Sequence, residues 1–289
     1  MAAATSPGRA PAGTTATARP GWMGRHPLAA FLLLCFGLTW ACLLPLAADS
    51  HGWLPFHAPR WLLLPAGWGP GLAAFGVAAA TGRRRELLER VTRWRLGLGW
   101  YAVALLGPGV LYAAAVALDT LLGGTPPTLP GPGSLLLGML LTLGLSLLTN
   151  SEEIGWRGFV LPRLLEQLSP AEASLVLGVV AAAWRLPFVA WVGGPLASTP
   201  LPAFAIFSLA AGVVLTWLYR GAGHSALPAL LLHAANTTWQ AVLPLAPGDT
   251  RPFEVDAGLC VLVAGLLVVS RRVPTGGVGP DGGAAKSAV

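Results

Sequence analysis

The sequence predicts an all-α membrane protein, a polytopic bundle of about eight transmembrane helices, and three observations favour it. Only 10% of the 289 residues are charged, against about 25% in an ordinary soluble domain. Hydrophobic residues make up 54% of the chain, and the mean hydropathy is +0.66. Long apolar runs recur along most of the sequence. So few charged residues cannot cover a soluble surface, and a disordered chain needs low hydrophobicity, so both classes are excluded.

The expected helix bundle covers residues 28–272. Residues 1–27, rich in Pro, Ala, Gly and Thr, are expected to form a disordered cytoplasmic tail, and the Gly-rich residues 273–289 a second one. The first apolar run, 28–48, is about twice as long as the core of a signal peptide, which predicts an uncleaved helix. The other expected spans are residues 61–81, 98–122, 134–150, 173–192, 202–219, 225–243 and 257–270.

The positions of lysine and arginine predict the orientation. If the N-terminus is cytoplasmic, fifteen of the 18 cationic residues fall in cytoplasmic segments, only Arg60 and Arg251 fall outside, and Arg185 falls within a span. This asymmetry predicts a multi-pass protein of the cell membrane with both termini in the cytoplasm. The net charge of +6 therefore indicates orientation and not nucleic-acid binding, and the expected partner is the lipid bilayer.

Ionisable side chains at membrane depth are functional candidates because hydrocarbon disfavours each of them. Glu152, Glu153 and Arg157 follow the fourth span. In a helix, Glu153 and Arg157 share a face and form an ion pair, which makes Glu153 the structural partner of Arg157. Glu152 points about 100° away and has no local counter-charge, so it is the candidate general base. The alternative is an exposed acidic pair neutralised by Arg157 and Arg163.

The fifth span is expected to begin at a capping box over residues 169–172. Near its end, Arg185 stands just before Pro187, where the helix should kink and free backbone carbonyls. Arg185 can hydrogen-bond those carbonyls, pair with Glu152 or Glu153, or face an aqueous cavity. It cannot bind a cation, because a guanidinium has no free lone pair.

A histidine and an amide lie on one face of the seventh span. Asn236 and Thr237 follow His233 by three and four residues, which is one helical turn. Such a group can donate hydrogen bonds to an oxyanion, or the imidazole can bind a metal with the amide as a weak oxygen ligand. The alternative is a histidine whose hydrogen bond packs two helices together.

Three ordered segments resemble motifs of the CPBP family, the CAAX prenyl protease and bacteriocin-processing (Abi) family of intramembrane glutamate or metalloproteases. Glu152–Arg163 matches the EExxxR motif with its usual flanks. Ala183–Pro187, read Ala-Trp-Arg-Leu-Pro, looks like the family's W-H-L-P. His233–Thr237 is similar to its HxxxN. The resemblance covers about residues 130–245, and the order, spacing and membrane helices all agree with it.

The resemblance implies hydrolysis of a membrane-proximal peptide or protein. Glu152 would activate a water that attacks the scissile amide, while histidines would stabilise the oxyanion or hold a metal, with zinc as the family's candidate. Glu153 and Arg157 would support this arrangement. The expected catalytic residues are Glu152, Glu153, Arg157, Arg185, His233 and Asn236.

Two positions depart from the family pattern. Arg185 replaces a histidine; arginine can donate to an oxyanion but cannot ligate zinc, so a metal mechanism loses a ligand. Asn236 follows His233 by three residues and not by four, with a threonine in the later slot. His224 could replace the lost ligand; otherwise His233 and Glu152 are the only candidate metal ligands, and no cofactor is assigned.

Three functions remain open at this point. The first is an intramembrane endopeptidase that uses glutamate-activated water, and the second is a catalytically impaired pseudoprotease that binds or scaffolds membrane proteins. A small transporter, with Glu152 and Arg185 as substrate or proton sites, fits the composition but not the motifs. Nothing in the sequence selects CAAX processing over a bacteriocin-related role.

Overall fold

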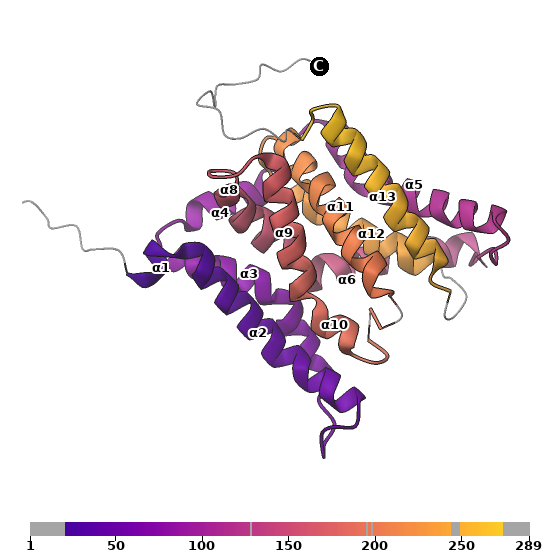
Figure 1. Ribbon diagram of the computed structural model, residues 1–289, viewed down its shortest axis with the longest axis horizontal. Helices are drawn as coiled ribbons and strands as arrows, with labels where there is room; N and C mark the ends of the chain where they lie inside the picture. The colour runs from indigo at the N-terminus through magenta and orange to yellow at the C-terminus, as the bar shows by residue number, and fades with distance from the viewer. Residues whose placement is uncertain (1–20, 128, 195, 198, 244–248, 274–289) are drawn as a thin grey trace, which may run out of the picture.

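The computed structural model describes residues 21–127, 129–194, 196–197, 199–243 and 249–273. These ranges contain helices and connecting turns but no β-strand, so the expected all-α membrane bundle is confirmed (Figure 1). Seven helical spans within the described residues are long and apolar enough to cross a membrane. They are α2 (Pro27–Ser50), η1 with α3 (Arg60–Leu62 and Leu63–Ala80), α5 (Leu98–Leu121), α6 (Pro132–Thr149), α9 with α10 (Pro170–Trp184 and Leu186–Ala190), α11 (Leu201–Gly221) and α13 (Arg251–Val269).

The eighth expected span is also a helix, α12 (Leu227–Val242), but it has only 16 residues. At 1.5 Å per residue it is about 24 Å long, which is less than the roughly 30 Å of a hydrocarbon core. It packs against both α5 and α6. Among the described residues, seven helical spans therefore reach the length of a membrane span, and the eighth expected run forms the shorter helix α12.

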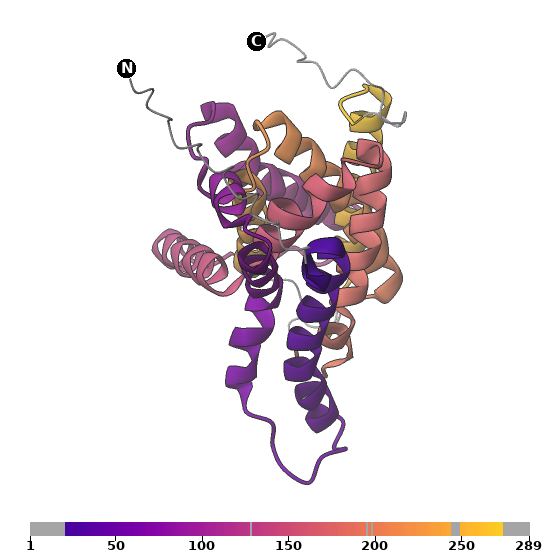
Figure 2. The ribbon, with the colours of Figure 1, turned by 90° about the vertical axis from the view of Figure 1, so that its left-hand side faces the viewer.

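Two groups of long helices form the bundle. α2 and α3 make an antiparallel hairpin that extends beyond the remaining helices, with its connecting loop at the bottom of Figure 2. α11 lies between α9 and α13, and α13 also packs on α5. α6 projects at the left of Figure 2 and contacts mainly α12, and Ser146 is its single buried residue. Most of the surface of α6 is therefore available to lipid.

The start of α9 agrees with the sequence prediction, whereas the start of the helical part of the chain does not. Ser169 Oγ accepts a hydrogen bond from the Glu172 N–H at 3.3 Å, and Glu172 Oε2 accepts one from the Ser169 N–H at 2.8 Å, so the capping box is confirmed. A short helix, α1 (Trp22–Arg25), lies inside the segment expected to be a tail, and the helical part thus begins earlier than residue 28. Residues 1–20 and 274–289 of the two expected tails lie outside the described residues.

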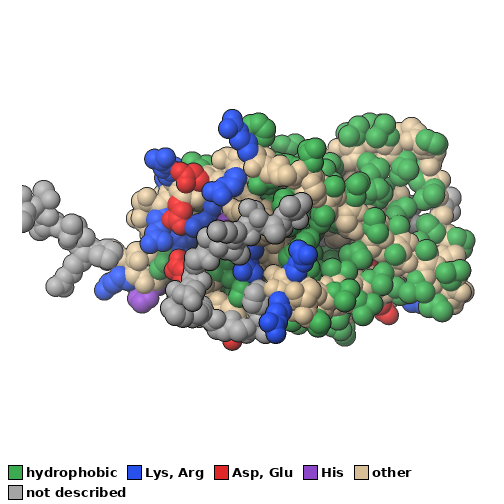
Figure 3. Space-filling view, turned by 90° about the horizontal axis from the view of Figure 1, so that it is seen from above, with side chains coloured by type: hydrophobic (Ala, Val, Ile, Leu, Met, Phe, Trp, Pro, Cys, Tyr) green, Lys and Arg blue, Asp and Glu red, His purple; other side chains and the backbone are tan. Residues whose placement is uncertain are grey.

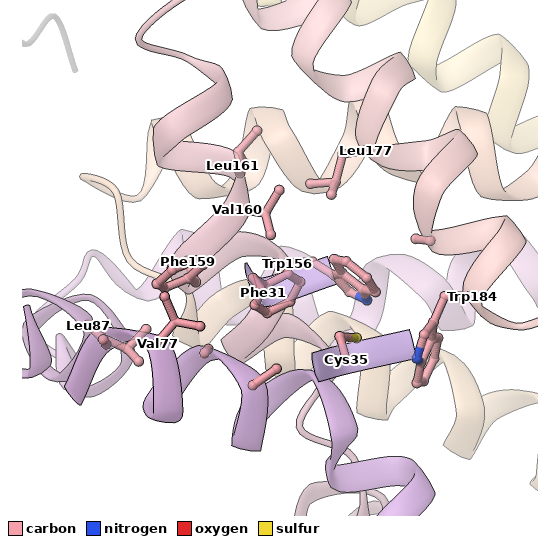
Figure 4. Close-up of a cluster of buried hydrophobic side chains, with 14 of the residues drawn as sticks. Phe31, Cys35, Val77, Leu87, Trp156, Phe159, Val160, Leu161, Leu177 and Trp184 are labelled. Atoms are coloured by element: carbon pink, nitrogen blue, oxygen red, sulfur yellow. The ribbon is translucent and has the colours of Figure 1, made fainter. Parts of the chain in front are cut away.

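An aromatic cluster joins the α2–α3 hairpin side of the bundle to the centre (Figure 4). The Phe31 ring stacks on Phe159 with 5.3 Å between centroids and meets the Trp156 edge at 5.4 Å. Trp156 in turn meets Trp184 at 6.0 Å. Each such pair contributes about 0.5–1.5 kcal/mol beyond the burial of its area. The cluster fixes the segment that follows α6 against both α2 and α9.

Candidate active site

Glu152 and Glu153 begin a helical segment with an irregular winding. The segment starts as α7 (Glu152–Gly155), widens into a π-helical turn, η2 (Trp156–Val160), and ends as α8 (Leu161–Leu164). π-Helical turns are rare and occur frequently at functional sites. Glu153 and Glu152 are 1% and 7% exposed, so the alternative of a solvent-exposed acidic pair is wrong.

Two polar residues hold the start of α7 in place. Asn150 Oδ1 accepts a hydrogen bond from the Glu152 N–H at 2.9 Å. Ser151 Oγ accepts one from the Gly71 N–H at 3.0 Å and donates to the Gly67 carbonyl at 3.2 Å. Asn150 and Ser151 were missed as site residues in the sequence. The available signal was a pair of polar residues between an apolar run and an acidic helix start.

Glu153 lies in a buried ion pair. Arg157 Nη1 is 2.9 Å from Glu153 Oε2, as the spacing predicts, and His233 Nδ1 is 3.0 Å from Glu153 Oε1. Burial raises the pKa of Glu153, but the charge of Arg157, the His233 contacts and the charge of Arg185 more than offset this, so its pKa lies below its ordinary value. Glu153 is therefore an ionised acceptor that orients other groups.

Glu152 has a counter-charge that its neighbours in sequence do not supply. Arg185, at the junction of α9 and α10, donates from Nη2 to Glu152 Oε2. The other carboxylate oxygen, Oε1, lies 3.9 Å from His233 Nε2. Side-chain exposures of 10% for Glu152, 17% for His233 and 20% for Arg185 leave this group within reach of solvent. The sequence left three partners open for Arg185, and the structure selects Glu152.

The partners of His233 determine its tautomer. An ionised Glu153 carboxylate can only accept, so the hydrogen between it and His233 belongs to Nδ1. In the neutral imidazole, Nε2 then carries the lone pair, and Nε2 is the nitrogen that faces Glu152. Glu153 thus positions His233 in the way that a buried carboxylate positions a catalytic histidine.

Other polar candidates lie away from these contacts. Asn236 is half-buried on α12, one turn after His233, and forms no side-chain hydrogen bond with the charged group. Thr237 is exposed and donates to the His233 carbonyl at 3.3 Å. His224 is exposed in the turn before α12, at a positive φ of 63°, with its ring edge against Tyr219. The structure does not bring His224 to the glutamates.

The residues present do not fit the zinc centre that the resemblance implies. Arg185 holds one oxygen of Glu152, while Arg157 and His233 hold Glu153. Within the described ranges, no group of three or more His, Cys, Asp or Glu side chains is arranged to hold a metal ion. A guanidinium at Glu152 would repel a divalent cation and cannot ligate one.

This geometry lies inside a segment that matches a known family. Residues 132–239, from the start of α6 to near the end of α12, match the family model described as type II CAAX prenyl endopeptidase Rce1-like. Residues 132–239 are an Rce1-like domain. The resemblance to CPBP proteases is thereby confirmed, and the domain contains all six expected site residues. The comparison with curated proteins finds no match.

At the level of the family, the Rce1-like domain is that of a CAAX-type intramembrane protease, a hydrolase of the membrane. The seven apolar helical spans in the described part of the chain agree with this family, because they make this a multi-pass membrane protein. The Rce1-like domain covers only the part from α6 to α12. The α2–α3 hairpin lies before it and supplies Gly67 and Gly71, which bind Ser151 next to Glu152.

Proposed function

We propose that the protein is an intramembrane endopeptidase that hydrolyses a peptide bond near the cytoplasmic membrane surface with a glutamate-activated water. One observation carries the proposal. Glu152, Arg185 and His233 come from three separate helical segments and meet with their polar atoms facing one another. The Rce1-like family match supports the same class of reaction.

The attacking water is assigned to a position beside Glu152 Oε1 and His233 Nε2, within hydrogen-bond distance of both atoms. Their separation of 3.9 Å is too long for a direct hydrogen bond and lies within the reach of one shared water. Glu152 Oε1 takes a proton from the water as its oxygen bonds to the amide carbon, and the carbonyl π electrons move onto oxygen. The proton then passes to the amide nitrogen as the C–N bond breaks, which releases an amine and a carboxylic acid.

The remaining groups have supporting roles in this proposal. Arg185 keeps further N–H donors beside the one that contacts Glu152, and these stabilise the oxyanion. Glu153 orients His233, and Arg157 neutralises Glu153. Asn236, one turn after His233, supplies an amide to the substrate backbone. The positive-inside asymmetry supports a cytoplasmic opening of the site in the cell membrane, with both termini on that side.

The test uses the full chain reconstituted in lipid vesicles. Two fluorogenic peptides of identical sequence are offered, one with a farnesylated C-terminal CAAX cysteine and one without the prenyl group. The parent cleaves at least one of them, and Glu152→Gln lowers kcat by about 10²–10⁴-fold because the base is lost while the shape remains. Glu89→Gln, an exposed glutamate on α4 (Arg84–Thr92), is the matched control and retains parental turnover.

Two outcomes contradict the proposal: no cleavage of either peptide by the parent, or equal turnover by the parent and Glu152→Gln. The contact between Arg185 and Glu152 is the observation that favours the second candidate function, a pseudoprotease that binds membrane peptides without cleaving them. That candidate predicts retention of the uncleaved peptide by the parent protein.

A further inference from the structure

A cationic cavity lies at one end of the bundle, apart from the glutamates. It has a volume of about 420 Å³, is open to the surface, and is lined by the junction of α1 and α2, the turn between α3 and α4, and the α8–α9 connection. Its cationic lining residues are Arg25, Arg83 and Arg163, with His26 beside them, and Glu166 is its single acidic lining residue. The cavity therefore carries an excess of positive charge.

The arginines of this cavity lack anionic partners. No ion pair involving Arg25, Arg83 or Arg163 is formed among the described residues. Arg163 is only 6% exposed, and its Nε–H has no hydrogen-bond partner there. Its guanidinium lies 3.6 Å from the centroid of the Phe159 ring and donates to the Phe159 carbonyl at 2.5 Å. Arg163 is thus held rigidly, with donor capacity to spare.

A second, more apolar cavity adjoins the cationic one. Its volume is about 660 Å³, and it shares Gly24, Thr81 and Arg83 with the cationic cavity. Its remaining lining residues are Gly21, Trp22, Met23 and Ala80. A cationic cavity that opens into an apolar one fits an amphiphile with an anionic head and a hydrocarbon tail.

The position of the cavities matches the headgroup layer of the inner leaflet. They lie where α2 begins at Pro27 and α3 ends at Ala80, the ends that the charge asymmetry assigns to the cytoplasm. Trp22, a residue type enriched at membrane interfaces, is 47% exposed there. Arginine side chains gather on the face seen in Figure 3.

The cationic cavity is distinct from the proposed active site. Arg163 follows Glu152 by eleven residues along one helical segment, which is about 16 Å of helix. The aromatic rings of Trp156 and Phe159 come from the intervening turn and are fully buried (Figure 4). A molecule in the cavity therefore does not touch the catalytic carboxylates.

We propose that this cationic cavity binds the phosphate of an anionic phospholipid of the cytoplasmic leaflet, with the acyl chains leaving through the adjoining apolar cavity. The phosphate accepts hydrogen bonds from Arg25, Arg83 and Arg163, and burial of the acyl chains adds hydrophobic free energy. A free phosphate offers the same anionic chemistry without the tails, so the experiment compares the two.

Binding is measured on the full-length protein in detergent by native mass spectrometry, with phosphatidylglycerol, phosphatidylcholine and inorganic phosphate in separate titrations. The parent binds phosphatidylglycerol with at least tenfold preference over phosphatidylcholine. The double variant Arg25→Gln/Arg83→Gln loses about thirtyfold in affinity for phosphatidylglycerol, because each arginine near a membrane surface contributes about a fivefold factor. The control Arg84→Gln/Arg95→Gln removes the same charge from exposed residues outside the cavity and retains parental affinity.

A variant that is expected to bind phosphatidylglycerol more tightly gives a result that misfolding cannot produce. Glu166→Gln removes the acidic lining residue and tightens phosphatidylglycerol binding severalfold. The proposal is overturned if the cavity and control variants weaken binding equally, or if inorganic phosphate binds as tightly as phosphatidylglycerol, which would assign the cavity to a free anion. Because the readout is lipid binding, failure of the proposed protease activity leaves this test intact.

Discussion

The contact between Arg185 and Glu152 decides how the site can work. In the CPBP pattern a histidine occupies this position, and an imidazole can pass a proton to a leaving amine, whereas a guanidinium stays protonated. In the proposed mechanism, proton transfer is left to Glu152 and His233, and Arg185 supplies charge and hydrogen-bond donors. The cluster therefore has the groups for hydrolysis but one fewer proton-exchanging side chain.

Substitutions at Arg185 test whether this arginine supports or inhibits peptide hydrolysis. Arg185→Gln is expected to lower kcat by about 10²-fold with little change in KM, because an oxyanion donor is lost. Arg185→His is expected to raise turnover above that of the parent, since it restores an exchangeable proton. Both are measured with the peptide-cleavage assay, with and without zinc. If Arg185→Gln is faster than the parent, the arginine blocks the base, and the binding function becomes the better account.

The contacts among the charged residues of the candidate site were predictable only in part. The pairing of Glu153 with Arg157 follows from helical spacing, and the structure confirms it. The contact of Glu152 with Arg185 was one of three alternatives, because local spacing says nothing about a partner 33 residues away. Ser151 was not identified, since its partners on α3 are 80 residues and more away in sequence.

The placement of α7 depends on its close approach to α3. Gly155 packs against Pro70 so tightly that a Cβ on the glycine would lie 2.8 Å from the Pro70 carbonyl oxygen. At Gly71, a Cβ would lie 2.5 Å from Ser151 Oγ and 2.6 Å from Ser151 Cβ. Contacts with α3 therefore fix the position at which α7, the helix that bears Glu152, begins.

Gly71→Ala is expected to displace α7, because the added methyl group would overlap the Oγ and Cβ atoms of Ser151. It should lower the free energy of unfolding by about 1–3 kcal/mol and reduce turnover more than tenfold. Gly76→Ala on the same helix is the matched control, since its Cβ meets nothing within 4 Å and helix propensity slightly favours alanine. The thermal unfolding midpoint in detergent and the turnover are both measured. Equal midpoints and turnover for the two variants would show that the contact does not position α7.

The helix positions were predictable from apolar runs, whereas their lengths and roles were not. All eight expected runs are helical, yet α12 is shorter than the sequence predicts, because Leu243 ends it and residues 225–226 remain in the preceding turn. The fifth run divides at Arg185 into α9 and α10, as Pro187 indicates. Which helix is internal depends on packing, and hydropathy alone does not report packing.

The orientation of the protein in the bilayer is a prediction from the distribution of its arginines, and it can be measured directly. Cysteines introduced by Trp53→Cys, in the α2–α3 loop, and by Arg95→Cys, before α5, probe opposite sides. In sealed right-side-out vesicles a membrane-impermeant maleimide should label Trp53→Cys only, and permeabilisation should expose Arg95→Cys. The native Cys35, Cys42 and Cys260 are buried and give a low background. The reverse labelling pattern would place both termini outside.

α6 links the surrounding lipid to the glutamates. Its leucines are largely exposed, with Leu141 at 64% and Leu148 at 72%, and its contacts within the protein are mainly to α12. Only Asn150 and Ser151 separate it from Glu152. A helix bordered by acyl chains adjusts its tilt to hydrocarbon thickness. Membranes of different chain length or sterol content would therefore shift the position of Glu152, because only two residues separate it from the end of the helix that responds to them.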